Sequence, residues 1–134
     1  MLVEQHRPPV DCNVIELPAG LSGDLPNQAD GALEESARRE LLEETGYRAK
    51  KMLRKAVVAS SAGLTDEVVT IFVAGGLEKI APGGGDESEN ITFHEVPLTE
   101  VDDWLARAQA DGKLVDGRVY AGLHFLRQNI SDGE

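Results

Sequence analysis

Cysteine, basic residues and long apolar runs are all scarce in this sequence. Its single cysteine, Cys12, cannot form a disulfide within the chain, which favours a reducing compartment. Lysine and arginine together number 13 against 24 aspartates and glutamates, and the formal net charge of -11 argues against the basic surface that nucleic-acid binding needs. No apolar run approaches the length of a membrane span, and residues 1–10 resemble neither a signal peptide nor a transit peptide. We therefore expect a soluble, cytoplasmic protein with no nucleic-acid partner and no membrane partner.

The chain is nevertheless long and apolar enough to fold. It has 134 residues, of which 41% are hydrophobic, so a single globular domain with its own core is expected over residues 1–134. The sequence shows no internal repeat and no linker between domains. Its acidic balance is compatible with a small phosphate-bearing ligand, because metal ions can bridge carboxylates to phosphates.

Strands and helices are expected to be mixed along the chain. Short strands are predicted at residues 1–5 and 14–17, followed by a loop over 20–31 that is rich in Gly, Pro, Asn and Asp. A helix should run from about residue 30 to 45, because apolar residues recur every four positions and Gly46 suits a left-handed C-terminal cap. The remaining elements expected are strands at 52–60, 67–75 and 91–98 and helices at 99–110 and 116–129. This mixture indicates an α/β or α+β sandwich.

The most informative stretch is RRELLEETGY, residues 38–47. Glu40, Glu43 and Glu44 are spaced so that they share one face of a helix, where like charges repel each other. A divalent cation removes this repulsion, since Mg²⁺ binds oxygen ligands and commonly uses one or two carboxylates together with substrate phosphates. From the spacing alone, a metal site and a solvated acidic helix face both stay open.

The residues around these glutamates carry a family resemblance. RELLEETGY, residues 39–47, matches the second half of the Nudix box, R-E-(apolar)-x-E-E-x-G-(apolar), at every fixed position. The sequence therefore resembles the Nudix hydrolases, which cleave a nucleoside diphosphate linked to another group. The resemblance implies Mg²⁺ or Mn²⁺ as cofactor and a Nudix-type α/β/α sandwich with a mixed β-sheet and a catalytic loop–helix.

The first half of the box departs from the family pattern. The family places a Gly fourteen residues before the Arg and a Glu eight before it, and this sequence has Leu25 and Gly31 at those positions. We take Gly20 as the equivalent of the family Gly, which gives the loop about five extra residues. This departure bears on loop geometry and on full activity more than on membership.

Further stretches resemble the ADP-ribose pyrophosphatase branch of the family. They are LVEQHRPPV (2–10), VIELPAGL (14–21), DESENI (86–91) and the C-terminal stretch that begins at VPLTEV (96–101). The implied reaction converts ADP-ribose to AMP and ribose 5-phosphate.

The resemblance assigns the metal to the helix and its surroundings. Glu40 and Glu44 would bind the metal directly, as would the backbone carbonyl of Ala19, and Glu89 would reach it from the acidic loop. Glu43 would be a catalytic-site residue, either as a further ligand or as an acceptor behind the ligands.

The resemblance also implies a base and substrate contacts. Glu87 would be the general base, Arg7 would contact the phosphates or the terminal ribose, and Glu67 would lie near the substrate. Each has a plainer alternative: acids in a Gly-rich loop are usually solvated, and Arg7 would pair with a surface carboxylate.

Several functions stay open. The branch usually carries some tens of residues before its first strand, so we expect a short form with a different base pocket, or a homodimer formed through another surface. A nucleotide sugar such as GDP-mannose or a nucleoside triphosphate is an alternative substrate. The alternative from another class is a non-catalytic Nudix module that binds a nucleotide or a protein.

Overall fold

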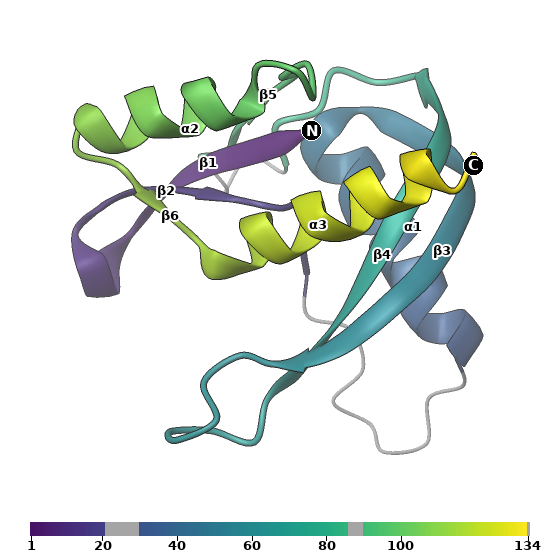
Figure 1. The fold of residues 1–134 in the computed structure, drawn as a ribbon, viewed down its shortest axis with the longest axis horizontal. Helices are drawn as coiled ribbons and strands as arrows, with labels where there is room; N and C mark the ends of the chain where they lie inside the picture. The colour runs from purple at the N-terminus through teal and green to yellow at the C-terminus, as the bar shows by residue number, and fades with distance from the viewer. Residues whose placement is uncertain (21–29, 86–89, 134) are drawn as a thin grey trace.

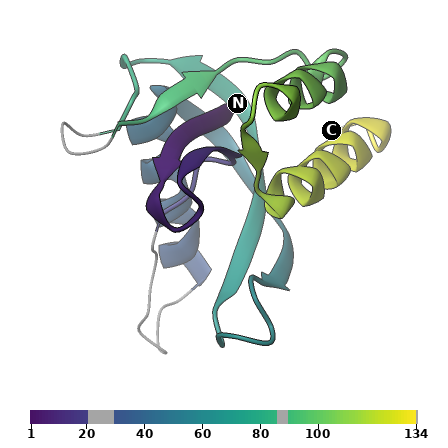
Figure 2. The same ribbon diagram turned by 90° about the vertical axis from the view of Figure 1, so that its left-hand side faces the viewer.

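The computed structural model describes residues 1–20, 30–85 and 90–133, and in them helices flank a layer of strands on both sides. Figure 2 shows helices α2 and α3 on one side of the strands and helix α1 on the other. This α/β/α arrangement is the one expected from the sequence.

The first sheet is small and mixed. Its described strands are β1 (Leu2–Arg7), β2 (Cys12–Glu16), β5 (Thr92–His94) and β6 (Leu114–Val115), in the order β5-β1-β2-β6. Strand β1 pairs antiparallel with β2 and with β5, whereas β6 pairs parallel with β2. A short 3-10 turn, Pro8–Val10, joins β1 to β2.

A buried carboxylate ties this sheet together. Glu4 on β1 is 8% exposed and accepts hydrogen bonds from Asn13 on β2 (2.8 Å) and from His94 on β5 (2.9 Å). The ammonium of Lys113, just before β6, lies 3.1 Å from the same carboxylate. The ring of His94 also packs against Trp104 of α2, with ring centroids 4.9 Å apart. The short strand β5 is therefore held by polar contacts as well as by its ladder.

The second sheet is a long hairpin. Strand β3 (Tyr47–Ala59) pairs antiparallel with β4 (Val68–Lys79), with a register shift between Arg54 and Ala56. Figure 1 shows the far end of this hairpin reaching beyond the helices. Both strands are longer than predicted. Strand β4 continues past the predicted end because its ladder with β3 extends to Lys79, and on the way it passes through Gly76, whose φ of 63° other residues avoid.

Helix α1 (Asp30–Thr45) has the predicted bounds and packs against β3 and β4. Gly46 follows it with φ 78° and donates its N–H to the carbonyl of Leu42 at 2.8 Å, as a left-handed cap requires. The end of the helix is thus fixed where the box sequence ends.

The two C-terminal helices lie side by side over the mixed sheet (Figure 1). Helix α3 (Gly117–Ser131) starts after Asp116, whose side chain accepts the N–H of Arg118 at 2.8 Å. Helix α2 (Val101–Ala110) starts two residues later than predicted, after Glu100, which makes no side-chain cap. The predicted strand over 91–98 was too long, since β5 ends at His94. No helix in the described part of the chain is long and apolar enough to cross a membrane.

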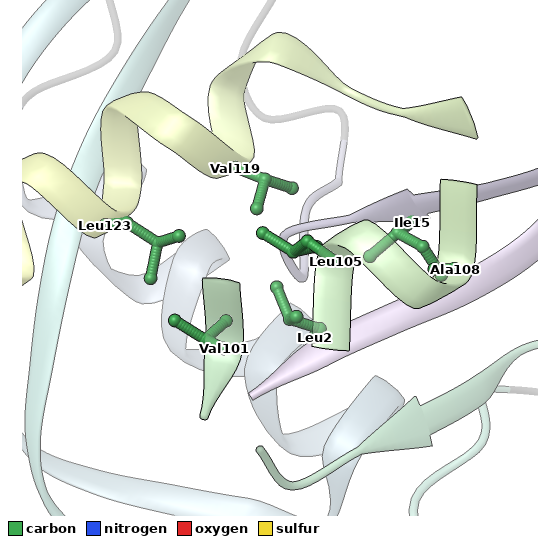
Figure 3. Close-up of a cluster of buried hydrophobic side chains, with 7 residues drawn as sticks. All are labelled: Leu2, Ile15, Val101, Leu105, Ala108, Val119 and Leu123. Carbon is green, nitrogen blue, oxygen red and sulfur yellow. The ribbon is translucent and has the colours of Figure 1, made fainter. Parts of the chain in front are cut away.

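The main core lies between this helix pair and the sheet. Figure 3 shows Ile15 of β2, Leu105 of α2 and Val119 of α3 converging, and each is at most 2% exposed. Burying each such side chain contributes roughly 1.5–3 kcal/mol. This packing fixes the start of α3 beside the end of β2, which is where the candidate site begins.

Candidate functional site

The most deeply buried of the three box glutamates is Glu44, in the last turn of α1. Glu44 is 4% exposed, and one of its carboxylate oxygens accepts the backbone N–H of Ala19 at 3.2 Å. Ala19 follows β2 after only two residues, so this bond joins the end of the sheet to the box helix. A carboxylate is buried at such a position only when charges or hydrogen bonds compensate it.

Glu40 lies one turn earlier on the same helix and faces the same backbone. A Cβ placed on Gly20 would lie 2.1 Å from the Glu40 carboxyl carbon, so the Glu40 side chain would have to shift to admit it. The carboxylate of Glu40 therefore occupies the space that a side chain at position 20 would fill. A glycine at position 20 therefore leaves room for this placement of the Glu40 carboxylate, which is consistent with Gly20 as the equivalent of the family Gly.

Glu43 is turned differently from its two neighbours. Its side chain is 53% exposed, against 18% for Glu40. The guanidinium of Arg39 lies 3.9 Å from Glu43 and 3.9 Å from Glu40, so it partly offsets the repulsion between them. The three carboxylates thus differ in burial, with Glu43 on the water side of the group.

Arg7 is held beside this group by an ion pair. It donates from Nε and from one Nη to the two oxygens of Glu16, both at 2.8 Å. Glu16 is the last residue of β2 and its side chain is 11% exposed. These hydrogen bonds raise the pKa of Arg7 above its ordinary value, and the charge of Glu44 adds to the effect. Arg7 therefore stays charged and close to the box helix, paired with a buried carboxylate rather than the surface one considered as its plainer alternative.

A second arginine, Arg118, joins Arg7 at this end of the sheet. It pairs with Asp116 through Nε (2.9 Å) and Nη (2.7 Å), and Asp116 itself is bonded to β2 through its N–H and the carbonyl of Ile15 (2.9 Å). Hydrogen bonding to Asp116 raises the pKa of Arg118, and the charges of Glu16 and Glu67 reinforce this. Glu67, exposed and just before β4, is therefore within electrostatic reach of Arg118.

The predicted acidic residues Glu87 and Glu89 lie outside the described residues. The chain on either side of them is described. Before them, the N–H groups of Gly84 and Gly85 donate to the last carbonyls of α1, at 2.8 and 2.9 Å. A hollow of about 300 Å³ lies between the two flanks. Its lining residues are Pro82, Gly83, Gly84, Ile91, Thr92 and Phe93.

Comparison with known proteins decides the family. The family described as NUDIX domain matches residues 1–119. The chain belongs to the NUDIX family.

Relatives of this Nudix chain carry more than one name. The protein of Bacillus methanolicus named methanol dehydrogenase activator is 31% identical over 128 residues, which cover 95% of this chain and 64% of the relative. The ADP-ribose pyrophosphatase of Bacillus subtilis (strain 168) is 36% identical over 103 residues, which cover 75% of this chain and 52% of the relative. The chain thus spans less than two thirds of the length of either relative.

A solved structure confirms the Nudix-type fold. It is described as the crystal structure of an ADP compounds hydrolase, and it matches with a TM-score of 0.74 at 20% identity. The match covers 98% of this chain and 66% of that chain. The predicted α+β class and box helix are therefore those of a known fold.

Nudix pyrophosphatases generally need a divalent metal ion, and the residues here fit one. Glu40 and Glu44 bring two carboxylates, the oxygen donors that Mg²⁺ and Mn²⁺ prefer, to the backbone of Ala19 and Gly20. Among residues 1–20, 30–85 and 90–133, no three His, Cys, Asp or Glu side chains converge as a metal site by themselves. The predicted ligand set also includes a backbone carbonyl, which is not a side chain, and Glu89, which lies outside the described residues.

Sequence reasoning missed three residues that the structure brings to this region. Glu16 stands in a buried strand, and a charged residue there was an available signal of a partner. Arg118 and Lys79, whose ammonium donates to the carbonyl of Thr45 at the end of α1 (2.8 Å), left no such signal, because their contacts depend on how α3 and β4 are placed.

Proposed function

We propose that this Nudix chain hydrolyses the pyrophosphate bond of ADP-ribose, giving AMP and ribose 5-phosphate. The observation that carries the proposal is the group formed by Glu40 and Glu44 against Ala19 and Gly20, with a charged Arg7 beside it. The likeness to an ADP-ribose pyrophosphatase supports this choice of substrate.

The proposed cofactor is Mg²⁺ or Mn²⁺. Glu40, Glu44 and Glu89, together with the carbonyl of Ala19, would hold the metal. When bound, a divalent cation neutralises charge on the pyrophosphate and lowers the pKa of the attacking water. The near-complete burial of Glu44 supports this role, because a metal ion would compensate the buried charge.

The remaining roles belong to groups that bind substrate or move a proton. Glu87 would accept the proton of the attacking water, and Glu43, the most exposed of the three box glutamates, would assist as a further ligand or acceptor. Arg7 has donors beyond the two that Glu16 occupies, and its guanidinium suits a phosphate oxygen. Glu67 would contact the substrate from just before β4, within electrostatic reach of Arg118.

Two alternatives stand beside this proposal. A nucleotide sugar such as GDP-mannose, or a nucleoside triphosphate, would be cleaved by the same groups, since both carry a pyrophosphate. A non-catalytic module that binds a nucleotide or a protein would explain the altered first half of the box. The retention of three close carboxylates favours the enzyme, because a module without a metal gains nothing from their repulsion.

A substrate panel tests the proposal. Purified chain is incubated with ADP-ribose, GDP-mannose and several nucleoside triphosphates, first with Mg²⁺ and then with Mn²⁺, and products are separated by chromatography. We expect AMP to form fastest from ADP-ribose. Faster cleavage of GDP-mannose would replace the substrate and keep the site, whereas binding without any turnover would favour the non-catalytic module.

The expectations of a cytoplasmic location, of a single domain over residues 1–134 and of a homodimer stay predictions. Sedimentation equilibrium of the purified chain measures its oligomeric state directly.

A further inference from the structure

Lys79, the last residue of β4, contacts four segments of the chain. Its ammonium donates to the carbonyl of Thr45 at 2.8 Å and to the carbonyl of Pro82 at 3.3 Å. It also lies 4.0 Å from the ring centroid of Phe93 and 5.0 Å from that of Tyr47. One cation thus joins the end of α1, the start of β3, the turn after β4 and strand β5.

A lysine suits this position because of what α1 lacks. A helix favours a cation at its C-terminal end, where carbonyl groups point outward without partners, and α1 has no basic residue in its last turn. Lys79, on strand β4, supplies a cation at this end, because its ammonium donates to the carbonyl of Thr45, the last residue of α1. The rings of Phe93 and Tyr47 also stabilise this ammonium through cation–π contacts.

Two glycines bring the backbones together at the same point. Gly46 (φ 78°) and Gly83 (φ 80°) both adopt the left-handed region. A Cβ on Gly46 would lie 1.9 Å from the carbonyl oxygen of Ala81, and a Cβ on Gly83 would lie 2.6 Å from the carbonyl carbon of Thr45. Both approaches are to backbone atoms, so no side chain can move aside to admit a methyl group. We call Lys79, Gly46 and Gly83 the helix-end clamp.

The clamp joins the end of α1 to the described chain on both sides of residues 86–89. On one side is α1, whose residues Glu40 and Glu44 are proposed ligands. On the other are both flanks of residues 86–89: Lys79 holds Pro82 before them and Phe93 after them. Lys79 and the two glycines therefore help to set the distance between α1 and these flanks, together with the hydrogen bonds that Gly84 and Gly85 donate to α1.

We propose that Lys79 is a positioning residue for metal-dependent hydrolysis, because it fixes the flanks of the acidic segment relative to the carboxylates of α1. This inference rests on the proposed function. It assigns Lys79 no contact with substrate. Its effect passes through the backbone of Thr45 and Pro82 and through the ring of Phe93.

The test compares Lys79→Met with Lys51→Met, a matched change at an exposed lysine on the neighbouring strand β3. Lys79→Met keeps the length of the side chain and removes its donors and its charge. We expect Mg²⁺ affinity, measured by calorimetry, and kcat for ADP-ribose each to fall about tenfold, as for loss of a group that orients metal ligands. KM for ADP-ribose should stay within about twofold of wild type, since no substrate contact is removed.

A second variant and a second readout keep the test independent of folding and of substrate. Lys79→Arg, which keeps the charge and the hydrogen-bond donors, should retain most of the Mg²⁺ affinity that Lys79→Met loses. Hydrogen exchange at the amides of Gly84 and Gly85 should accelerate in Lys79→Met and remain unchanged in Lys51→Met.

The outcomes separate the two proposals. If Lys79→Met lowers only the melting temperature, and its Mg²⁺ affinity and kcat match those of Lys51→Met, Lys79 is a structural cap and the inference is overturned. If wild type cleaves nothing and Lys79→Met still weakens Mg²⁺ binding, the proposed function fails while the positioning role stands.

Discussion

Replacing Glu44 with Gln should separate the fold of this Nudix chain from its chemistry. The Glu44 side chain is 4% exposed and accepts the N–H of Ala19, and a glutamine offers an amide oxygen of nearly the same shape to that donor. The change removes the like-charge repulsion from Glu40 and the desolvation cost of a buried charge, which stabilises the fold, and it removes the attraction to Arg7, which destabilises it, so these effects oppose each other. Without metal, the free energy of unfolding should therefore change by less than about 1 kcal/mol, a shift of roughly 4 °C in melting temperature.

Added Mg²⁺ should stabilise wild type much more than Glu44→Gln. A cation at a hundred times its dissociation constant stabilises wild type by about 2.7 kcal/mol, or roughly 10 °C. If Glu44→Gln weakens binding about a hundredfold, the same Mg²⁺ concentration stabilises the variant by only about 0.4 kcal/mol, near 1–2 °C. The rate of ADP-ribose hydrolysis should fall by at least about a hundredfold.

The assay is thermal unfolding followed by circular dichroism, with and without Mg²⁺, alongside AMP release. Glu35→Gln is the matched control, since it removes the same charge from an exposed position on the same helix. It should keep both the Mg²⁺ shift and the rate. A Glu44→Gln protein that keeps the full Mg²⁺ shift and full activity would refute the placement of the metal, and one that fails to fold would refute the structural reasoning.

Three further results are expected. Gly20→Ala should displace the Glu40 carboxylate and weaken Mg²⁺ binding about tenfold by calorimetry, and an unchanged affinity would contradict the close contact. Arg7→Lys loses the two-pronged bond to Glu16 and should raise KM for ADP-ribose about tenfold, whereas an unchanged KM would leave Arg7 a purely structural residue. Burial opposes the ionisation of Glu4, but hydrogen bonds from its three partners outweigh it and lower the pKa of Glu4 below 4.5. The stabilisation from ionised Glu4 is fully present above the pKa that Glu4 has in the unfolded chain, and it is lost as pH falls through the lower pKa of Glu4 in the folded protein. The melting temperature of wild type should therefore drop more steeply below about pH 4.5 than that of Glu4→Gln.

Local signals explain why α1 was predicted with its observed bounds. Its apolar spacing and the glycine at position 46 act within the helix itself, and no distant contact is needed to end it. Strand β3 was predicted to begin at residue 52 because the preceding YRAKK is charged and a poor strand former. It begins at Tyr47 because its ladder with β4 extends as far as Lys79.

Strand β6 was not predicted, because it has no local signal in the sequence. Leu114 and Val115 are too few to show alternation, and they become a strand only by pairing with Val14 and Ile15 of β2. That pairing in turn places Asp116, and hence Arg118, beside Glu16. A site residue that depends on a tertiary contact of this kind has no counterpart in sequence spacing.

The contrast between local sequence signals and tertiary contacts also holds within the site. The spacing of the box glutamates predicted that they share one helix face, and the family resemblance assigned them to a metal site. The structure adds that Glu44 is buried, that Glu40 lies against Gly20 and that Glu43 faces water. These differences arise from the segment that follows β2, which the helix periodicity does not describe.

The most direct measurement is the product analysis of ADP-ribose incubated with the purified wild-type chain and Mg²⁺, with Glu44→Gln run in parallel. Cleavage between the two phosphates should give AMP and ribose 5-phosphate in equal amounts from wild type and neither product from the variant. Intact ADP-ribose after long incubation with a folded, Mg²⁺-binding wild-type protein would contradict the proposed hydrolysis, and equal product from both proteins would contradict the site.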